Sequence, residues 1–112
     1  MDQLVAPKPP PLSLTQAAVR ALERLQDDLA ARYRIRPGRI TANNGIAVLD
    51  LGDFQVWCHR GTSFTWSDGV DERNRAVLAK EPTSNLAEAA KRVAIRYRQV
   101  HGYQPAPARR AG

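Results

Sequence analysis

Cys58 and His59 are the closest pair of reactive side chains in the sequence. A thiol beside an imidazole would suit nucleophilic catalysis or metal binding. The pair falls in an alternating segment that predicts a β-strand, where successive side chains point to opposite faces of the sheet. Cys58 and His59 therefore cannot act on one substrate or share one metal ion, and we expect Cys58 to be a small core thiol.

The other titratable residues do not form a recognisable catalytic or metal-binding pattern. His101 is the only other histidine, so the chain has too few cysteines and histidines for a zinc site of three or four ligands. The adjacent carboxylates Asp27–Asp28 and Asp71–Glu72 have a spacing typical of a helix surface and a polar loop. The sequence contains neither G-x-x-x-x-G-K nor G-x-G-x-x-G, the glycine patterns that bind phosphates. We therefore expect no catalytic residues, no metal, no cofactor and no enzymatic activity.

Basic residues offer a different chemistry, the binding of anions. The chain has 17 basic and 11 acidic residues, and its net charge is +6. Residues 31–40 hold four arginines and no acidic residue, and the C-terminal third holds a second basic group. If helix ends bring these groups together, they form a surface that would neutralise several phosphates, and otherwise they are a solvated basic surface. The residues concerned are Arg32, Arg34, Arg36, Arg39, Lys91, Arg92, Arg96 and Arg98.

Aromatic residues make up only 6% of the chain, so each is expected to contribute strongly to packing or binding. If Cys58 faces the core, the alternation places Trp57 and His59 on the outer face of the sheet. An exposed tryptophan on a sheet is typical of an interface anchor or a base-stacking platform. A shift of one residue in register would bury Trp57 instead. The candidate protein-binding residues are Trp57, His59 and Trp66.

Two helices and a set of strands must position these residues. Ser13 and Gln16 have the S-x-x-Q spacing of a capping box, and an apolar stripe follows them toward Pro37-Gly38. A second helix is expected to begin after Asn85, which would cap it, and to end at Gly102. Each helix has one apolar stripe to bury.

Residues 39–79 have the composition of strands. Their β-branched and aromatic segments are separated by short turn signals, which force neighbouring strands to be antiparallel. The signals are Asn44-Gly45, expected to form a type I′ turn, and Gly52-Asp53 and Gly61-Thr62, expected to form type II′ turns. A charged loop over 67–75 is predicted to lead to a last strand at 76–79.

The predicted fold is α+β: a helix, an antiparallel meander of three to five strands and a second helix, with both helices on one face of the sheet. A single domain over 13–102 lies between a flexible Pro-rich leader (1–12) and a disordered tail (103–112). No apolar run approaches the roughly 18–20 residues that cross a bilayer, and the N-terminus lacks the pattern of a signal peptide. We therefore expect a cytoplasmic protein.

Part of the body resembles a group of small uncharacterised proteins of actinomycetes. The shared pattern is a tryptophan-bearing hairpin, residues 56–61 and 64–69, followed by an E-A-A-x-R-x-A-x-x-Y helix within residues 85–97. This resemblance covers about half of the body. It implies a high-GC bacterial source and a cytosolic accessory role, and it supplies no catalytic residues.

The expected function is that of a non-enzymatic accessory or regulatory protein that binds another protein. The outer face of the sheet near Trp57 would be the contact surface, and a homodimer through the same face is a variant of this hypothesis. The alternative is nucleic-acid binding through the arginine-rich segments 32–39 and 91–98. The sequence indicates no small-molecule substrate and no membrane interaction.

Overall fold

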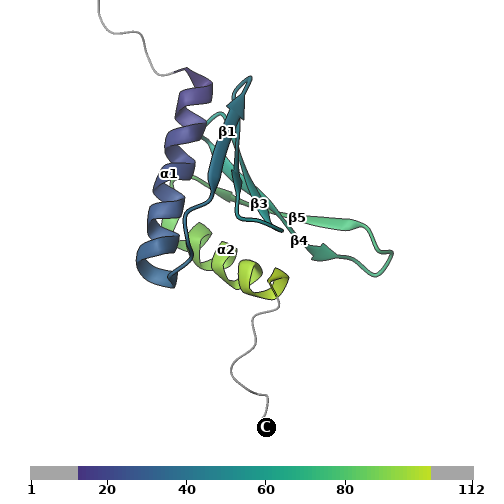
Figure 1. Ribbon diagram of the computed structural model, residues 1–112. Helices are drawn as coiled ribbons and strands as arrows, with labels where there is room; N and C mark the ends of the chain where they lie inside the picture. The colour runs from purple at the N-terminus through teal and green to yellow at the C-terminus, as the bar shows by residue number, and fades with distance from the viewer. Residues whose placement is uncertain (1–12, 102–112) are drawn as a thin grey trace, which may run out of the picture.

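The computed structural model describes residues 13–101, which form one antiparallel sheet with two helices on one of its faces (Figure 1). The five strands lie in chain order across the sheet. The predicted fold class and element order are confirmed, and the predicted leader and tail lie outside the described residues. The elements are α1 (Leu14–Tyr33), β1 (Arg39–Asn43), β2 (Ile46–Asp50), β3 (Gln55–His59), β4 (Ser63–Val70), β5 (Ala76–Pro82) and α2 (Leu86–Val100).

Helix α1 begins with the predicted capping box. The Gln16 N–H donates to Ser13 Oγ and the Ser13 N–H donates to Gln16 Oε1, both at 3.0 Å. The helix ends at Tyr33, four residues before Pro37, so the predicted end was too late. Arg34 adopts a left-handed conformation (φ 58°) there, and the following N–H, of Ile35, bonds to the Leu29 carbonyl at 3.2 Å. This reversal turns the buried Ile35 back onto the core.

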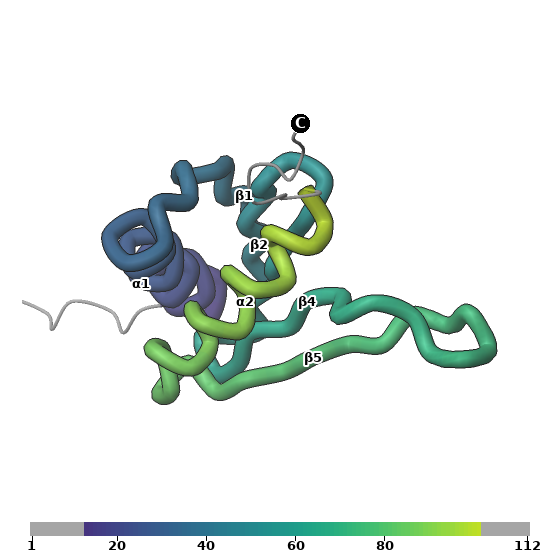
Figure 2. The backbone as a smooth tube through the Cα atoms, turned by 90° about the horizontal axis from the view of Figure 1, so that it is seen from below, coloured from purple at the N-terminus to yellow at the C-terminus, as the bar shows by residue number. Residues whose placement is uncertain are grey.

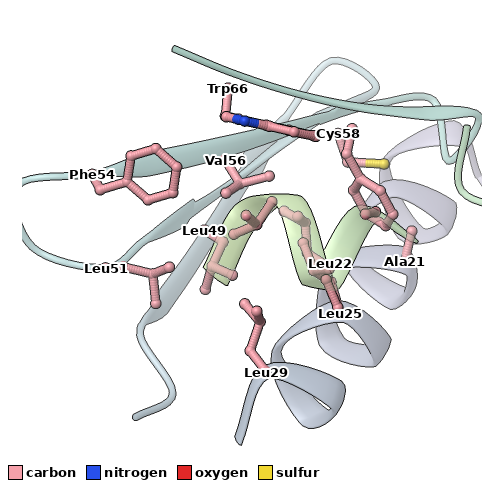
Figure 3. Close-up of a cluster of buried hydrophobic side chains, with 14 of the residues drawn as sticks. Ala21, Leu22, Leu25, Leu29, Leu49, Leu51, Phe54, Val56, Cys58 and Trp66 are labelled. Carbon is pink, nitrogen blue, oxygen red and sulfur yellow. The ribbon is translucent and has the colours of Figure 1, made fainter. Parts of the chain in front are cut away.

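The core lies between the helices and the inner face of the sheet, the face that the helices cover. The strand register aligns Leu49, Val56, Trp66 and Ala79 in one buried row across four strands. Figure 3 shows leucines of α1 pointing toward this row, with a turn of α2 beside them. All the residues of this row are more than nine-tenths buried, so the inner face is the hydrophobic side that holds the domain together.

Short turns set the register of the strands. Asn44 and Gly45 both have positive φ angles (53° and 82°), as the predicted type I′ turn requires. The Gly45 N–H donates to Thr15 Oγ1 at 2.7 Å, which ties this turn to the first turn of α1. The β3–β4 connection differs from the prediction: it has three residues, and Arg60 as well as Gly61 is left-handed.

The predicted loop over 67–75 is instead a hairpin that projects from the body. β4 continues to Val70 and β5 begins at Ala76, so only five residues form the connection. Asp71 orders that connection, because its carboxylate accepts hydrogen bonds from the N–H groups of Arg73 (2.8 Å) and Arg75 (2.9 Å). Figures 1 and 2 show the ribbon of β4 and β5 extending beyond both helices. We call the projecting part, residues 67–78, the arm.

Helix α2 begins after Asn85 as predicted, but the Asn85 side chain does not cap it. Asn85 Nδ2 donates to Glu81 Oε2 at 2.8 Å, and Arg92 Nη1 donates to the other oxygen of the same carboxylate at 2.7 Å. The ionised carboxylate thus holds the amide nitrogen of Asn85 by a charge-assisted hydrogen bond, and no backbone N–H of α2 donates to the side chain of Asn85. Hydrogen bonding by Arg92, and secondarily by Asn85, lowers the pKa of Glu81 below its usual value.

The lowered pKa of Glu81 predicts a loss of stability in acid. A carboxylate with a folded-state pKa below its unfolded value stabilises the fold above the unfolded value, about 4.3, and that contribution is lost as pH falls through the folded value. The unfolding free energies of wild type and Glu81→Gln should therefore differ most near neutral pH and converge between about pH 5 and pH 3. Glu88→Gln, on the exposed side of α2, is the control. A difference between wild type and E81Q that does not change with pH would contradict this assignment.

Candidate protein-interaction face

The outer face of the sheet, which the helices leave uncovered, carries a group of apolar side chains. The register places Val48, Trp57 and Thr65 side by side across three strands. Ile46, on β2 with Val48, is 38% exposed, and Leu78, on the neighbouring strand β5, is 63% exposed. We define the outer patch as the six residues around an open depression of about 400 Å³, namely Ile46, Val48, Trp57, His59, Thr65 and Leu78.

The two tryptophans lie on opposite faces of the sheet. Trp57 is half-buried within the outer patch, as the alternation with the buried Cys58 predicts. Trp66 is only 1% exposed, because the register pairs it with Val56 and Ala79 on the inner face. The prediction that Trp66 binds a protein partner was therefore wrong, since its ring belongs to the core.

Four members of the outer patch were not identified from the sequence: Ile46, Val48, Thr65 and Leu78. They are neighbours of Trp57 only once the strand register is known. The Asn44-Gly45 turn contains part of that information, because a two-residue connection places Ile46 opposite Asn43. The position of Leu78 depends on the register between β4 and β5. These strands are joined by five residues, and no two-residue turn signal in the sequence sets their register.

A bulge in β4 extends the apolar outer face into the arm. The register shifts by one residue between Ser67 and Val70, where Gly69 has a φ of 103°. Val70 thereby lies opposite Ala76, two residues along β5 from Leu78, so Val70 shares the face of Leu78. Val70 is 62% exposed. The exposed apolar surface is therefore longer than the depression around Trp57.

Cys58 lies on the inner face, directly behind the outer patch. Burial raises the pKa of its thiol, and hydrogen bonding by the backbone of Gly61 and Ser63 acts in the opposite direction. His59 points to the outer face, so the thiol and the imidazole do not meet. Cys58 thus contributes a packing surface on the side of the sheet that holds the helices.

The buried thiol is expected to be protected from thiol reagents in the folded protein. At pH 8, Cys58 should react with a disulfide reagent at least about 100-fold more slowly in the native state than in urea, because reaction requires an opening of the core. Thr62→Cys in a Cys58→Ala background supplies an exposed thiol as the control. Native Cys58 reacting as fast as that control would show that the core is open.

The two arginine-rich segments meet where α1 ends. Arg98 Nη2 of α2 donates to the Tyr33 carbonyl at 3.3 Å, and its guanidinium lies 5.9 Å from the centre of the Tyr33 ring. The two segments therefore touch through this contact, which was the condition for a shared basic surface. Arg34 and Arg36, which follow Tyr33 in the chain, are exposed, and so are Arg39 on β1 and Lys91 on α2.

Four of the eight predicted phosphate-binding residues have structural partners: Arg98 at the junction with Tyr33, and three others. Arg32 forms an ion pair with Asp28 at 3.0 Å. Arg92 forms one with Glu81 at 2.7 Å, and its guanidinium lies 5.2 Å from the centre of the Trp66 ring. Arg96 Nε donates to the Ser67 carbonyl. The basic surface is therefore narrower than the sequence suggested, and it is centred on the end of α1.

Residues 13–101 contain no group of three or more His, Cys, Asp or Glu side chains placed to hold a metal ion. Neither of the helices in this range is long and apolar enough to cross a membrane. No protein-family model matches the chain, and neither the curated proteins nor the solved structures provide a match. Any function must therefore be argued from the surface of the molecule itself.

Proposed function

We propose that the protein is a non-enzymatic, cytoplasmic accessory or regulatory protein that acts by binding another protein through the outer patch. The observation that carries the proposal is the position of Trp57, Ile46 and Leu78 on a sheet face that neither helix covers. Contiguous exposed apolar surface of this kind marks interaction sites in soluble proteins. A central, half-buried tryptophan is the residue type that most often dominates the energy of such contacts.

The charges around the outer patch favour a protein over a polyanion as its partner. Arg39 stands opposite Asp50 at one end of the face, and Lys80 stands beside Thr65. Charges of both signs therefore border the outer patch, and its centre is apolar. The arginine-rich junction lies elsewhere, at the end of α1. Contact through this face would bury apolar surface rather than neutralise phosphates. A second copy of the chain presents the same apolar face and could bury it, so a homodimer is included in the proposal.

Affinity capture with matched variants tests the proposal. Wild type, Leu78→Ser and Ile95→Ser are immobilised in parallel and exposed to nuclease-treated extract of the native cell. Ile95 is the control because it is also an exposed aliphatic residue, at 49%, but belongs to α2. A protein retained by wild type and I95S and lost with L78S supports the outer patch. Equal retention by all three variants would contradict it.

Nucleic-acid binding is the second candidate function, and the contact of Arg98 with Tyr33 favours it by bringing the two basic segments together. Binding through the exposed arginines would depend steeply on salt, because each neutralised phosphate releases counterions. A titration of random duplex DNA between about 50 and 200 mM salt measures that slope. Arg34→Glu with Arg36→Glu should abolish the binding. No binding by wild type at the lower salt concentration would exclude this candidate.

A further inference from the structure

Strands β3 and β4 separate at one end of their ladder and leave a cavity between them. Their pairing ends at Val56 and Trp66, although β4 continues to Val70. We call this place the fork. Its cavity has a volume of about 250 Å³ and is lined mainly by Asp53, Gln55, Trp57, Ser67, Arg96 and Val100. Pockets for drug-sized ligands begin near 300 Å³, so the fork suits a smaller molecule.

Arg96 reaches the fork from α2 and is half-buried there. Its Nε donates to the Ser67 carbonyl at 3.2 Å and its Nη1 donates to Gln99 Oε1 at 3.0 Å, and both acceptors are neutral. Among residues 13–101, no carboxylate forms an ion pair with Arg96, whereas Arg92, one turn earlier and also half-buried, is paired with Glu81. A partly buried cation without a counter-ion favours the binding of an anionic group.

Asp53 contributes the opposite charge to the same cavity. Its carboxylate is exposed at the turn between β2 and β3, and it forms no ion pair with Arg96. The fork therefore offers a cation and an anion that form no ion pair with each other. A ligand that carries both charges would bridge them, and a ligand with one charge would leave the other group uncompensated.

The walls of the fork are held in place by the protein's own contacts. The Gly52 N–H donates to Asp50 Oδ1 at 2.9 Å, and Gln55 Nε2 donates to the Gly52 carbonyl at 3.2 Å, so the turn that carries Asp53 is fixed. The Arg96 guanidinium lies beneath Gly69, where an added Cβ would stand 3.8 Å from Nη1. A site that is ordered before the ligand arrives loses less entropy on binding.

We propose that the fork binds a free α-amino acid, with the ligand carboxylate on Arg96, the ligand ammonium on Asp53, and the ligand side chain against Trp57 and Val100. Charge-assisted hydrogen bonds at both ends fix the orientation, and the apolar walls accept an aliphatic side chain. This inference does not depend on the proposed protein-binding function, although Trp57 borders both the fork and the outer patch.

The indole N–H signals of the two tryptophans provide a direct readout by nuclear magnetic resonance. Trp57 lines the fork, and the buried Trp66 does not, so Trp66 is an internal reference. The probes are L-leucine, 4-methylpentanoate, which lacks the amine, and 3-methylbutylamine, which lacks the carboxylate. L-Leucine should shift the Trp57 signal in a saturable manner. Each single-charge analogue should bind at least about tenfold more weakly, because it makes only one of the two charge-assisted hydrogen bonds.

Two variants separate the ligand contacts from the fold. Asp53→Asn alters an exposed side chain and Arg96→Gln removes the cation, and each should weaken leucine binding at least about tenfold. Glu72→Gln and Arg20→Gln, exposed residues away from the fork, should bind leucine like wild type. Arg96 also donates a hydrogen bond to the Ser67 carbonyl. If R96Q does not fold for this reason, leucine binding by D53N alone tests the proposal.

Three results would overturn the proposal. The first is a Trp57 signal that L-leucine does not shift at about 10 mM, ten times a dissociation constant of 1 mM. The second is binding of the amine or the acid as tight as that of leucine. The third is unchanged leucine binding by D53N. None of these results bears on protein capture by the outer patch, so the two proposals fail separately.

Discussion

Trp66→Ala is expected to lower the free energy of unfolding by about 3–5 kcal/mol, the range for removing a large buried aromatic side chain. Native domains have only about 5–15 kcal/mol in total, so this loss is a large fraction of the stability. Trp66 is among the largest fully buried side chains of the core. Its removal would leave a cavity between the sheet and α2, since Arg92 lies over the ring on the helix side.

Urea unfolding followed by circular dichroism measures this effect. Trp66→Phe is the control, because it keeps an aromatic ring in the same row and should be destabilised much less than W66A. A loss of less than about 1 kcal/mol in W66A would contradict the inner-face position of Trp66, since exposed substitutions usually stay within about half of that value. The register between β3 and β4 would then need revision.

Trp57→Ala is expected to weaken binding of the partner strongly and to lower the free energy of unfolding only slightly. Binding of the captured partner should weaken by at least about 2 kcal/mol, a factor of about 30, because truncating a central tryptophan of an interface removes a dominant contact. The free energy of unfolding should change by no more than about 1–2 kcal/mol, since Trp57 contributes cross-strand pairs with Val48 and Thr65 rather than core packing.

Calorimetric titration of the partner with wild type and Trp57→Ala measures the binding loss, and urea unfolding of the same samples measures stability. Ile95→Ala removes another exposed apolar side chain and should leave the affinity within about twofold of wild type. If W57A binds as tightly as wild type, the outer patch is not the contact surface. If W57A unfolds as readily as W66A, Trp57 belongs to the core.

The sequence predicts the layered fold well because its signals are local. The capping box at Ser13 and Gln16 and the positive φ angles at Asn44 and Gly45 depend on residues within a few positions of each other. The end of α1 could not be predicted in this way. Arg34, a non-glycine residue, takes the left-handed conformation because the buried Ile35 packs back against the core, and this is a tertiary contact.

The candidate site was only partly predictable for the same reason. Alternation along β3 places Trp57 on the outer face. Alternation within β4 does not by itself say which of its residues share that face, and the assignment of Trp66 to the binding surface was wrong. The contribution of Val70 depends on a bulge at Gly69. The fork depends on where β3 and β4 separate and on the position of Arg96 in α2. No local sequence pattern indicates either feature.

Acrylamide quenching of Trp57 fluorescence tests most directly whether the outer patch is the protein-binding surface. In Trp66→Phe, Trp57 is the only tryptophan, so all the tryptophan emission comes from the outer face. The quenching constant should be high for the free monomer and should fall toward that of a buried indole when the captured partner is added at saturation. Trp57 that is shielded in the free monomer, or equally accessible in the complex, would contradict the proposed function.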